Sequence, residues 1–342
     1  MSGRPVSVPS APAVRLRSPA QIAAAIPYLV GFHPQESLVV VGLQGDPRTV
    51  CLTLRVDLPS VEDRGDLCVT LAAHLRHAAA RTAIAVVFSE QPGEQPEAGL
   101  IAAVEEALED EDLVLGDALW VRSGRWWSYR CRDSGCCPPA GTPVDTGSVA
   151  DLAAASAWLG DVVHRSRADL ERSLAPLDGG RRVDLDHTFE WVSRQLIDEL
   201  AARGWEAVAE DTIRLLTEAI AERAERDLQL SPARLARIAL GLADARVRDR
   251  ALTWAGGRLE HAAEALWVEL ARSATPPYDA PAATLIAVHA YLRGNGAYAR
   301  IALDRALSSD PAYSFALLLA EGLDRGVPPR ALRQALRGER AA

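Results

Sequence analysis

Three of the five cysteines of this 342-residue chain, Cys131, Cys136 and Cys137, lie within seven positions of one another. A thiolate sulfur is both a ligand for soft metals and a nucleophile, so this cluster could hold zinc or carry thiol chemistry. A structural zinc site needs four ligands, and the cluster supplies at most three, so a distant His or Cys would have to join it. We favour a third interpretation, a packed turn with buried cysteines, because Cys is among the most buried residue types. Zinc binding and a reactive thiol stay open as alternatives.

Polar residues at the ends of two predicted strands form a second candidate site. His33 and Glu36 precede a strand that begins at Ser37, and Arg55 and Asp57 end the strand that follows. If the two strands pair as a hairpin, the start of the first lies beside the end of the second, and these residues share one sheet edge. A histidine, carboxylates and an arginine there could perform acid–base catalysis or bind an anion. The plainer alternative is an ion pair on a solvent-exposed strand beside a capped turn.

The elements that must position these residues alternate between strands and helices. Ser18 followed by Pro19 predicts the capped start of a helix. The expected elements are a helix near 19–29, strands at 37–43 and 50–58, a helix near 60–79, a strand at 83–88, a helix near 97–110, a strand at 118–122 and a return strand toward 131. This order predicts an α/β fold with a mixed sheet of hairpins plus parallel crossovers.

The predicted topology also decides which residues share an edge of the sheet. Right-handed parallel crossovers would bring Ser89, Glu90 and Arg122 to the edge that holds His33, whereas the return strand would carry Cys131 to the opposite edge. The two candidate sites are therefore expected to be separate. In the second strand, strict alternation predicts Val50, Leu52, Leu54, Val56 and Leu58 on one face and Cys51, Thr53, Arg55 and Asp57 on the other.

From about residue 148 onward, the strand signals stop and Ala/Leu/Arg/Glu-rich helical patterns fill the chain. Residues 282–311 resemble one tetratricopeptide repeat in their small, apolar and terminal positions, without the first-helix tryptophan. The expected organisation is a disordered tail at 1–14, an α/β domain at 15–147, an all-α helical region at 148–275 and TPR-like helical hairpins at 276–342.

The composition excludes several classes of protein. A formal net charge of −9 argues against a general nucleic-acid binder, because such proteins need a positive field to displace counterions from phosphate. No apolar run is long enough to cross a membrane. The start of the chain lacks the pattern of a cleaved signal peptide, so we expect a cytoplasmic protein. In that reducing compartment the five thiols should not form a disulfide framework.

Several motifs resemble one known family. They are Leu16-Arg17-Ser18-Pro19, the run from Val30 through Phe32-His33-Pro34-Gln35-Glu36-Ser37 to Leu43, Cys136-Cys137-Pro138-Pro139-Ala140-Gly141, Val247-Arg248-Asp249, and the segment Gly294 to Pro311. The chain resembles an uncharacterised actinobacterial family, the domain-of-unknown-function family 4192, over nearly all of residues 15–330. The resemblance implies a cytoplasmic actinobacterial protein without an assigned activity, and it supplies no catalytic residues.

Two functional hypotheses follow from these observations. The first is a non-enzymatic interaction or regulatory protein whose helical region binds a protein partner, because stacked helical hairpins commonly offer concave surfaces to protein segments. A homo-oligomer is compatible with it. The second is an enzyme or small-molecule binder that uses the sheet edge at His33, Glu36, Asp57 and Arg55, or a zinc or thiol site at Cys131, Cys136 and Cys137. No cofactor other than zinc is expected.

Overall fold

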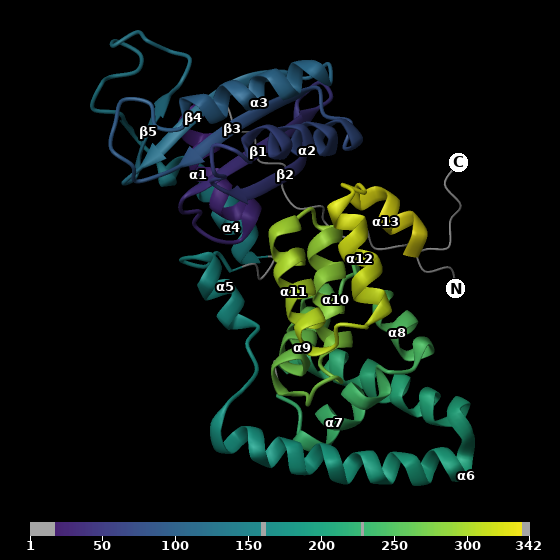
Figure 1. Ribbon diagram of the computed structural model, residues 1–342. Helices are drawn as coiled ribbons and strands as arrows, with labels where there is room; N and C mark the ends of the chain where they lie inside the picture. The colour runs from purple at the N-terminus through teal and green to yellow at the C-terminus, as the bar shows by residue number, and fades with distance from the viewer. Residues whose placement is uncertain (1–17, 159–161, 227–228, 337–342) are drawn as a thin grey trace, which may run out of the picture.

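The structure is a computed structural model that describes residues 18–158, 162–226 and 229–336. Its first part is built on a single six-stranded sheet, followed by helices (Figure 1). The tail expected at 1–14 lies outside the described residues. The strands are β1 (Ser37–Gln44), β2 (Thr49–Asp57), β3 (Thr82–Phe88), β4 (Val114–Arg122), β5 (Arg125–Ser128) and β6 (Thr142–Pro143).

The sheet is mixed, with the strand order β2-β1-β3-β4-β5-β6. β1 lies between β2 and β3 and is antiparallel to both, whereas β3 and β4 are parallel and β5 returns antiparallel to β4. The predicted α/β class with hairpins plus parallel crossovers is confirmed. Ser37 pairs with Asp57 on one side and with Phe88 on the other, so the start of β1 meets the ends of β2 and β3.

The predicted alternation of the second strand is only partly right. The register between β1 and β2 shifts between Gly42 and Leu43, where Leu52 and then Val50 are the partners, so Cys51 is an extra residue in the ladder. A bulge of this kind turns the preceding side chain away from its expected face. Val50 is accordingly 42% exposed. Leu52, Leu54, Val56 and Leu58 pack together on the same hydrophobic cluster, as expected, and Cys51 joins them.

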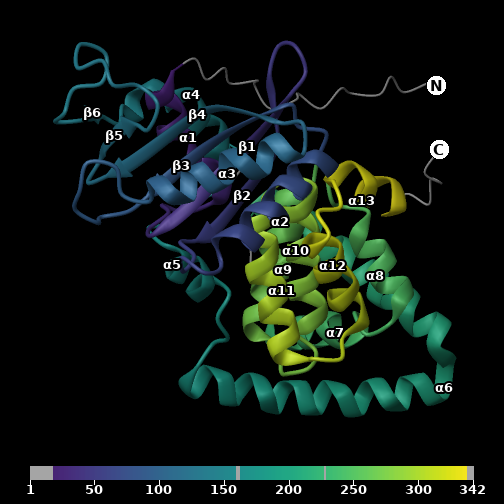
Figure 2. The same ribbon diagram turned by 45° about the horizontal axis from the view of Figure 1, so that its top comes forward.

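The two faces of the sheet are covered by different parts of the chain (Figures 1 and 2). Helices α2 (Arg64–His77) and α3 (Ala98–Asp110) lie on one face, over buried side chains such as Leu38 and Val87. Helix α1 (Pro19–Val30) and residues of the helical region cover the other, over Val39 and Val86. β1 and β3 are buried on both faces, which explains their continuous apolar sequences.

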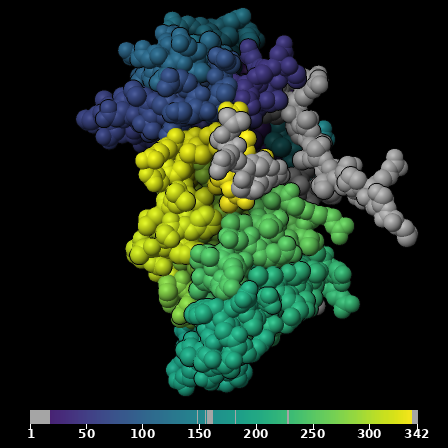
Figure 3. Space-filling view, turned by 90° about the vertical axis from the view of Figure 1, so that its right-hand side faces the viewer, coloured from purple at the N-terminus to yellow at the C-terminus, as the bar shows by residue number. Residues whose placement is uncertain are grey.

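Every named element after β6 is helical. Near its middle, α6 is bent at Gly204, where φ is 77° (Figure 1). Figure 3 shows the α/β part at the top, the last helices directly beneath it, and α6 at the far end. The helices are η1 (Thr146–Val149), α4 (Ala150–Trp158), α5 (Arg167–Ser173), α6 (Gly179–Arg226), α7 (Pro232–Gly241), α8 (Ala245–Leu252), α9 (Glu260–Ser273), α10 (Ala280–Leu292), α11 (Gly296–Ser309), α12 (Ser314–Asp324) and α13 (Pro329–Leu336).

Helices α10 and α11 pack against each other and are joined by a short link. Helix α10 is buried on all sides, with every residue from Ala280 to Leu292 in the core. A paired helix therefore exists where the repeat-like sequence predicts one, but the pairing alone does not make it a tetratricopeptide repeat, and that relation stays a prediction. None of the helices in the described ranges is long and apolar enough to cross a membrane.

Candidate functional site

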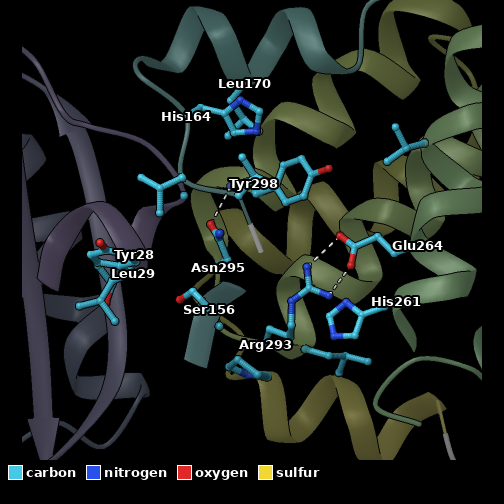
Figure 4. A pocket seen from close by; sticks show the side chains of 18 of the residues that line it. Tyr28, Leu29, Ser156, His164, Leu170, His261, Glu264, Arg293, Asn295 and Tyr298 are labelled. Carbon is cyan, nitrogen blue, oxygen red and sulfur yellow. Dashed lines mark hydrogen bonds and ion pairs between the residues drawn. The ribbon is translucent and has the colours of Figure 1, made fainter. Parts of the chain in front are cut away.

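A pocket of about 970 Å3 lies where the sheet meets the helical region (Figure 4). Its walls come from the end of α1, the start of β2, the segment that precedes α5, and helices α9, α10 and α11. The lining residues include Leu29, Gly31, His164, Leu170, Arg223, Glu264, Ala265, Arg293, Asn295 and Tyr298.

One wall of the pocket is formed where α1 ends. Gly31 ends the helix in the left-handed conformation, with φ at 86°, which is favourable for glycine because it lacks a Cβ. The chain then pairs with the segment before α5: the His164 N–H donates to the Gly31 carbonyl at 2.9 Å, and the His33 N–H donates to the His164 carbonyl at 3.0 Å. This backbone pairing holds two segments of the pocket wall together although they are more than 130 positions apart in the sequence.

The opposite wall carries a partly buried ion pair. Arg293 contacts the Glu264 carboxylate in a two-point arrangement, with nitrogen–oxygen distances of 2.6 and 2.8 Å, and it contacts Glu260 at 3.2 Å. Glu264 is buried. Two-point pairing of a guanidinium with a carboxylate fixes the orientation of both groups. Burial raises the pKa of Glu260, and the neighbouring Arg293 opposes that rise.

A neutral histidine lies close to these charged groups. The Trp267 indole N–H donates to His289 Nε2 at 3.3 Å, so Nε2 is the acceptor and the imidazole proton belongs on Nδ1. His289 Nδ1 faces a Glu260 carboxylate oxygen at 3.7 Å. His289 is completely buried, and this burial lowers its pKa to about 4. The ring is therefore uncharged at neutral pH.

The start of α11 supplies the floor of the pocket. Asn295 caps this helix, because its side-chain oxygen accepts from the Tyr298 N–H at 2.9 Å. A Cβ at Gly31 would lie 3.2 Å from Asn295 Nδ2, so α1 and α11 meet closely here. At another side of the pocket, Arg223 forms an ion pair with Glu269. Because both arginines of the pocket are paired with glutamates, the lining can bind a ligand mainly through hydrogen bonds.

The structure brings most of the predicted sheet-edge residues together. The Glu36 carboxylate accepts from the Ser89 hydroxyl at 3.0 Å and from the Glu90 N–H at 2.8 Å. Arg55 pairs with Asp57 at 2.7 Å and donates to the Ser37 hydroxyl, also at 2.7 Å. The sequence reasoning identified this juxtaposition from topology alone.

The sheet-edge groups are engaged in contacts within the protein. Arg55 has a side chain only 6% exposed and lies over the Phe32 ring, and burial lowers its pKa. His33 is exposed, and within the described ranges no side-chain hydrogen bond or ion pair joins it to Glu36 or Asp57. The arrangement ties the ends of β1, β2 and β3 together. A catalytic role for His33, Glu36, Arg55 and Asp57 stays a prediction.

The cysteine cluster lies in the loop between β5 and β6, away from the pocket. The sulfur atoms of Cys131, Cys136 and Cys137 all lie within 4.8 Å of one another. The expectation of buried cysteines does not hold, since Cys136 is exposed and the other two are half-buried. A backbone hydrogen bond from Asp133 lowers the pKa of the Cys131 thiol. Burial, together with the neighbouring cysteines, raises the pKa of Cys137 to about 12.

No sequence pattern indicated the pocket. Its polar residues come from segments with ordinary helical patterns, and Arg293, Glu264 and His289 are spaced like any surface or core residues of helices. One local sign existed: Asn295, directly after Gly294, predicts a helix stop and a new N-cap. That sign locates the α10–α11 link without showing what the link faces.

A family model described as a domain of unknown function, DUF4192, matches residues 19–330. No curated protein and no solved structure matches the chain. The matched residues include α1, the whole sheet, the cysteine loop and the helices that line the pocket. Because the match covers far more than half of its length, the chain belongs to the DUF4192 family, as its motifs indicated.

Proposed function

We propose that this protein binds a small organic molecule in the pocket between the sheet and the helical region. The observation that supports this function is the pocket itself, about 970 Å3 in volume. Binding sites for small molecules are concave, of roughly 300–1,000 Å3, mostly apolar with a few fixed polar groups, and they concentrate where structural units meet. This pocket has each of those properties.

The lining indicates the chemistry of the ligand. Leu29, Leu170 and Ala265 offer apolar surface for a hydrocarbon or aromatic body. Arg293 and Asn295 are held in fixed orientations by their own contacts, so they can select a ligand group by direction. Two arginines on the wall are paired with three glutamates, which leaves no positive excess. We therefore propose a neutral or zwitterionic ligand rather than a phosphate ester.

The experiment is native mass spectrometry of the full chain, purified gently from its own host. Ala265→Phe would fill part of the pocket, and Ala102→Phe on the exposed side of α3 is the matched control. We expect a bound small molecule on the wild-type protein and on Ala102→Phe, and its loss from Ala265→Phe with an unchanged melting temperature. A wild-type protein without such a mass, whose melting temperature does not respond to a host metabolite extract, would contradict the proposal.

We also propose that the helical region binds a protein partner, and that a second copy of the chain is the first partner to test. Trp191, Ile197 and Trp205 on α6 are 55%, 62% and 65% exposed. Tryptophan is enriched in protein interfaces, and two-fold homodimers are the commonest assemblies. Light scattering at increasing concentration should show a dimer that Trp205→Ala weakens. A monomer at every concentration would exclude this occupant.

A further inference from the structure

We propose that Cys131, Cys136 and Cys137 form a three-thiolate site for a thiophilic divalent cation, with one coordination position open to solvent. The site lies in the loop between β5 and β6 and does not depend on the ligand proposed for the pocket. Zinc is the ion that we choose to represent the class, because its Zn–S bonds and tetrahedral geometry are well defined.

The positions of the sulfur atoms fit such an ion. All three lie within 4.8 Å of one another. With Zn–S bonds of about 2.3 Å, two thiolates on a tetrahedral zinc lie about 3.8 Å apart. Small rotations about the side-chain bonds are therefore enough to close the site. Sulfur ligands also select zinc and other soft cations over magnesium and calcium, which prefer oxygen.

A tight turn allows two consecutive cysteines to face the same point. The carbonyl of Asp133 accepts from the Cys136 N–H at 3.1 Å and from the Cys137 N–H at 2.7 Å. The Asp133 carboxylate accepts from the Gly135 N–H at 2.8 Å. Adjacent side chains diverge on a regular strand or helix, but this turn folds the chain back toward Cys131. Cys136 and Cys137 can therefore both bind the ion that Cys131 binds, although they are adjacent in the sequence.

The N-terminal side of the loop is fixed to the sheet. The Ser128 hydroxyl oxygen accepts from the N–H groups of Arg130 and Cys131, each at 3.1 Å. The Arg130 guanidinium donates to the Leu115 carbonyl at 2.6 Å and pairs with Glu105. These contacts place Cys131 at a defined point beside the start of β4. A site whose ligands are held in place loses less conformational entropy when an ion binds.

The C-terminal side of the loop is fixed equally well. Arg125 donates to the carbonyls of Ala140 and Gly141, at 2.8 and 2.9 Å, and the Trp127 indole N–H donates to the Pro139 carbonyl at 3.0 Å. Trp127 itself stacks on Trp120, with ring centroids 4.5 Å apart. Two aromatic rings and one guanidinium thus hold the segment that follows Cys137. Several side-chain contacts thus fix the position of a surface loop, which supports a functional role for it.

The open position follows from the number of ligands. Three thiolates supply three of the four positions of a tetrahedral ion. Among the described residues, no further His, Cys, Asp or Glu joins the cluster. Cys136 is exposed, so solvent reaches the site. Structural zinc sites are closed by four protein ligands, whereas sites that exchange a ligand keep a fourth position for water or substrate. We therefore infer an ion with an exchangeable ligand.

The test uses the full chain under reducing conditions, titrated with Zn2+ and, separately, with Co2+ as a spectroscopic probe. We expect one ion per chain by native mass spectrometry and a thiolate-to-cobalt charge-transfer band with tetrahedral ligand-field absorption. Added imidazole should alter that spectrum by entering the open position. Cys136→Ser is the main variant, because its exposed side chain is the one least needed for folding. The matched control is Cys51→Ser, outside the cluster.

Cys136→Ser should weaken zinc binding by at least about tenfold, while Cys51→Ser should not change it. Cys131→Ser and Cys137→Ser should do the same as Cys136→Ser, with folding checked by circular dichroism. Equal zinc affinity in the wild type and Cys136→Ser would overturn the site. A cobalt spectrum that imidazole does not alter would overturn the open position. If the ligand of the pocket is also absent, that result bears on the proposed function and leaves this proposal unaffected.

Discussion

The pocket wall and the cysteine loop hold their polar groups in opposite ways. In the pocket, Arg293 is matched by Glu264 and Glu260, and all three belong to or adjoin helices α9 and α10. In the loop, three thiols lie close together, and no cationic side chain among the described residues pairs with them. The loop is held in place by side chains that donate hydrogen bonds to its backbone carbonyls. The charged groups of the pocket wall are therefore paired with one another, whereas the thiols of the loop are held in position without a charged partner among the described residues.

This difference shows what each region can bind. A wall whose charges are already paired can orient a ligand through hydrogen bonds, but it gains little from a further ion. A loop that holds three thiols close together can release their protons to a soft cation and bind it through three thiolates. Mutations should therefore affect the two regions differently. Removing a charged group of the pocket wall should lower stability, whereas removing a cysteine of the loop should weaken metal binding.

The largest effect should come from breaking the charge match in the pocket wall. Glu264→Ala leaves Arg293 partly buried with only Glu260 beside it, so we expect the free energy of unfolding to fall by about 3 kcal/mol. Chemical denaturation measures this change. Glu190→Ala is the control, because its partner Arg194 is 75% exposed, and it should cost less than about 0.5 kcal/mol. A loss below about 1 kcal/mol for Glu264→Ala would show that Arg293 does not depend on Glu264 for the compensation of its charge.

The next effect concerns pH and the histidine behind the wall. The pKa of His289 is about 4 in the folded protein and near its ordinary value of 6.5 when unfolded. Between these values the unfolded chain takes up a proton that the folded protein does not. The free energy of unfolding therefore falls as pH drops from 7 to 4, by on the order of 3 kcal/mol from this group.

His289→Gln removes this proton uptake. The difference in unfolding free energy between the wild type and the variant should therefore shrink by on the order of 3 kcal/mol between pH 7 and pH 4. The neighbouring carboxylates Glu260 and Glu264 are present in both proteins, so the comparison isolates the histidine. A difference that stays constant with pH would show that His289 is not held neutral by burial.

The smallest effect should come from the cysteine loop. Gly141 has φ at 72°, and a Cβ there would overlap the Trp127 ring. Gly124 has φ at 73° with nothing within 4 Å of the same position. Both Gly→Ala variants carry the backbone strain of about 1 kcal/mol, and Gly141→Ala should cost about 1 kcal/mol more because of the overlap. Thermal unfolding would check this, and equal costs would indicate that the ring moves freely.

The sequence was sufficient for the elements and for their local ends. The β-branched run of β1 and the capped start of α1 at Ser18 are short-range signals, so most strands and helices were placed within a few residues of their observed limits. The short strand β6 was not predicted, and the return strand β5 ends at Ser128 instead of reaching Cys131. The hairpin between β1 and β2 pairs Ser37 with Asp57, so Glu36 and Asp57 lie at the same sheet edge, as predicted. The bulge at Cys51 was missed, because alternation in one strand does not show a register shift against its neighbour.

By itself, the sequence determined the α/β class, the change to helices from about residue 148, the shared edge of β1 and β2, and a cysteine cluster separate from that edge. Only the tertiary structure decided that Gly31 pairs with His164, that Arg293 meets Glu264 behind a pocket, and that Cys136 is exposed. The physical reason is the range of the interactions. Periodicity and capping act within a few residues, whereas a pocket wall depends on which distant surfaces bury each other, and no local pattern encodes that choice.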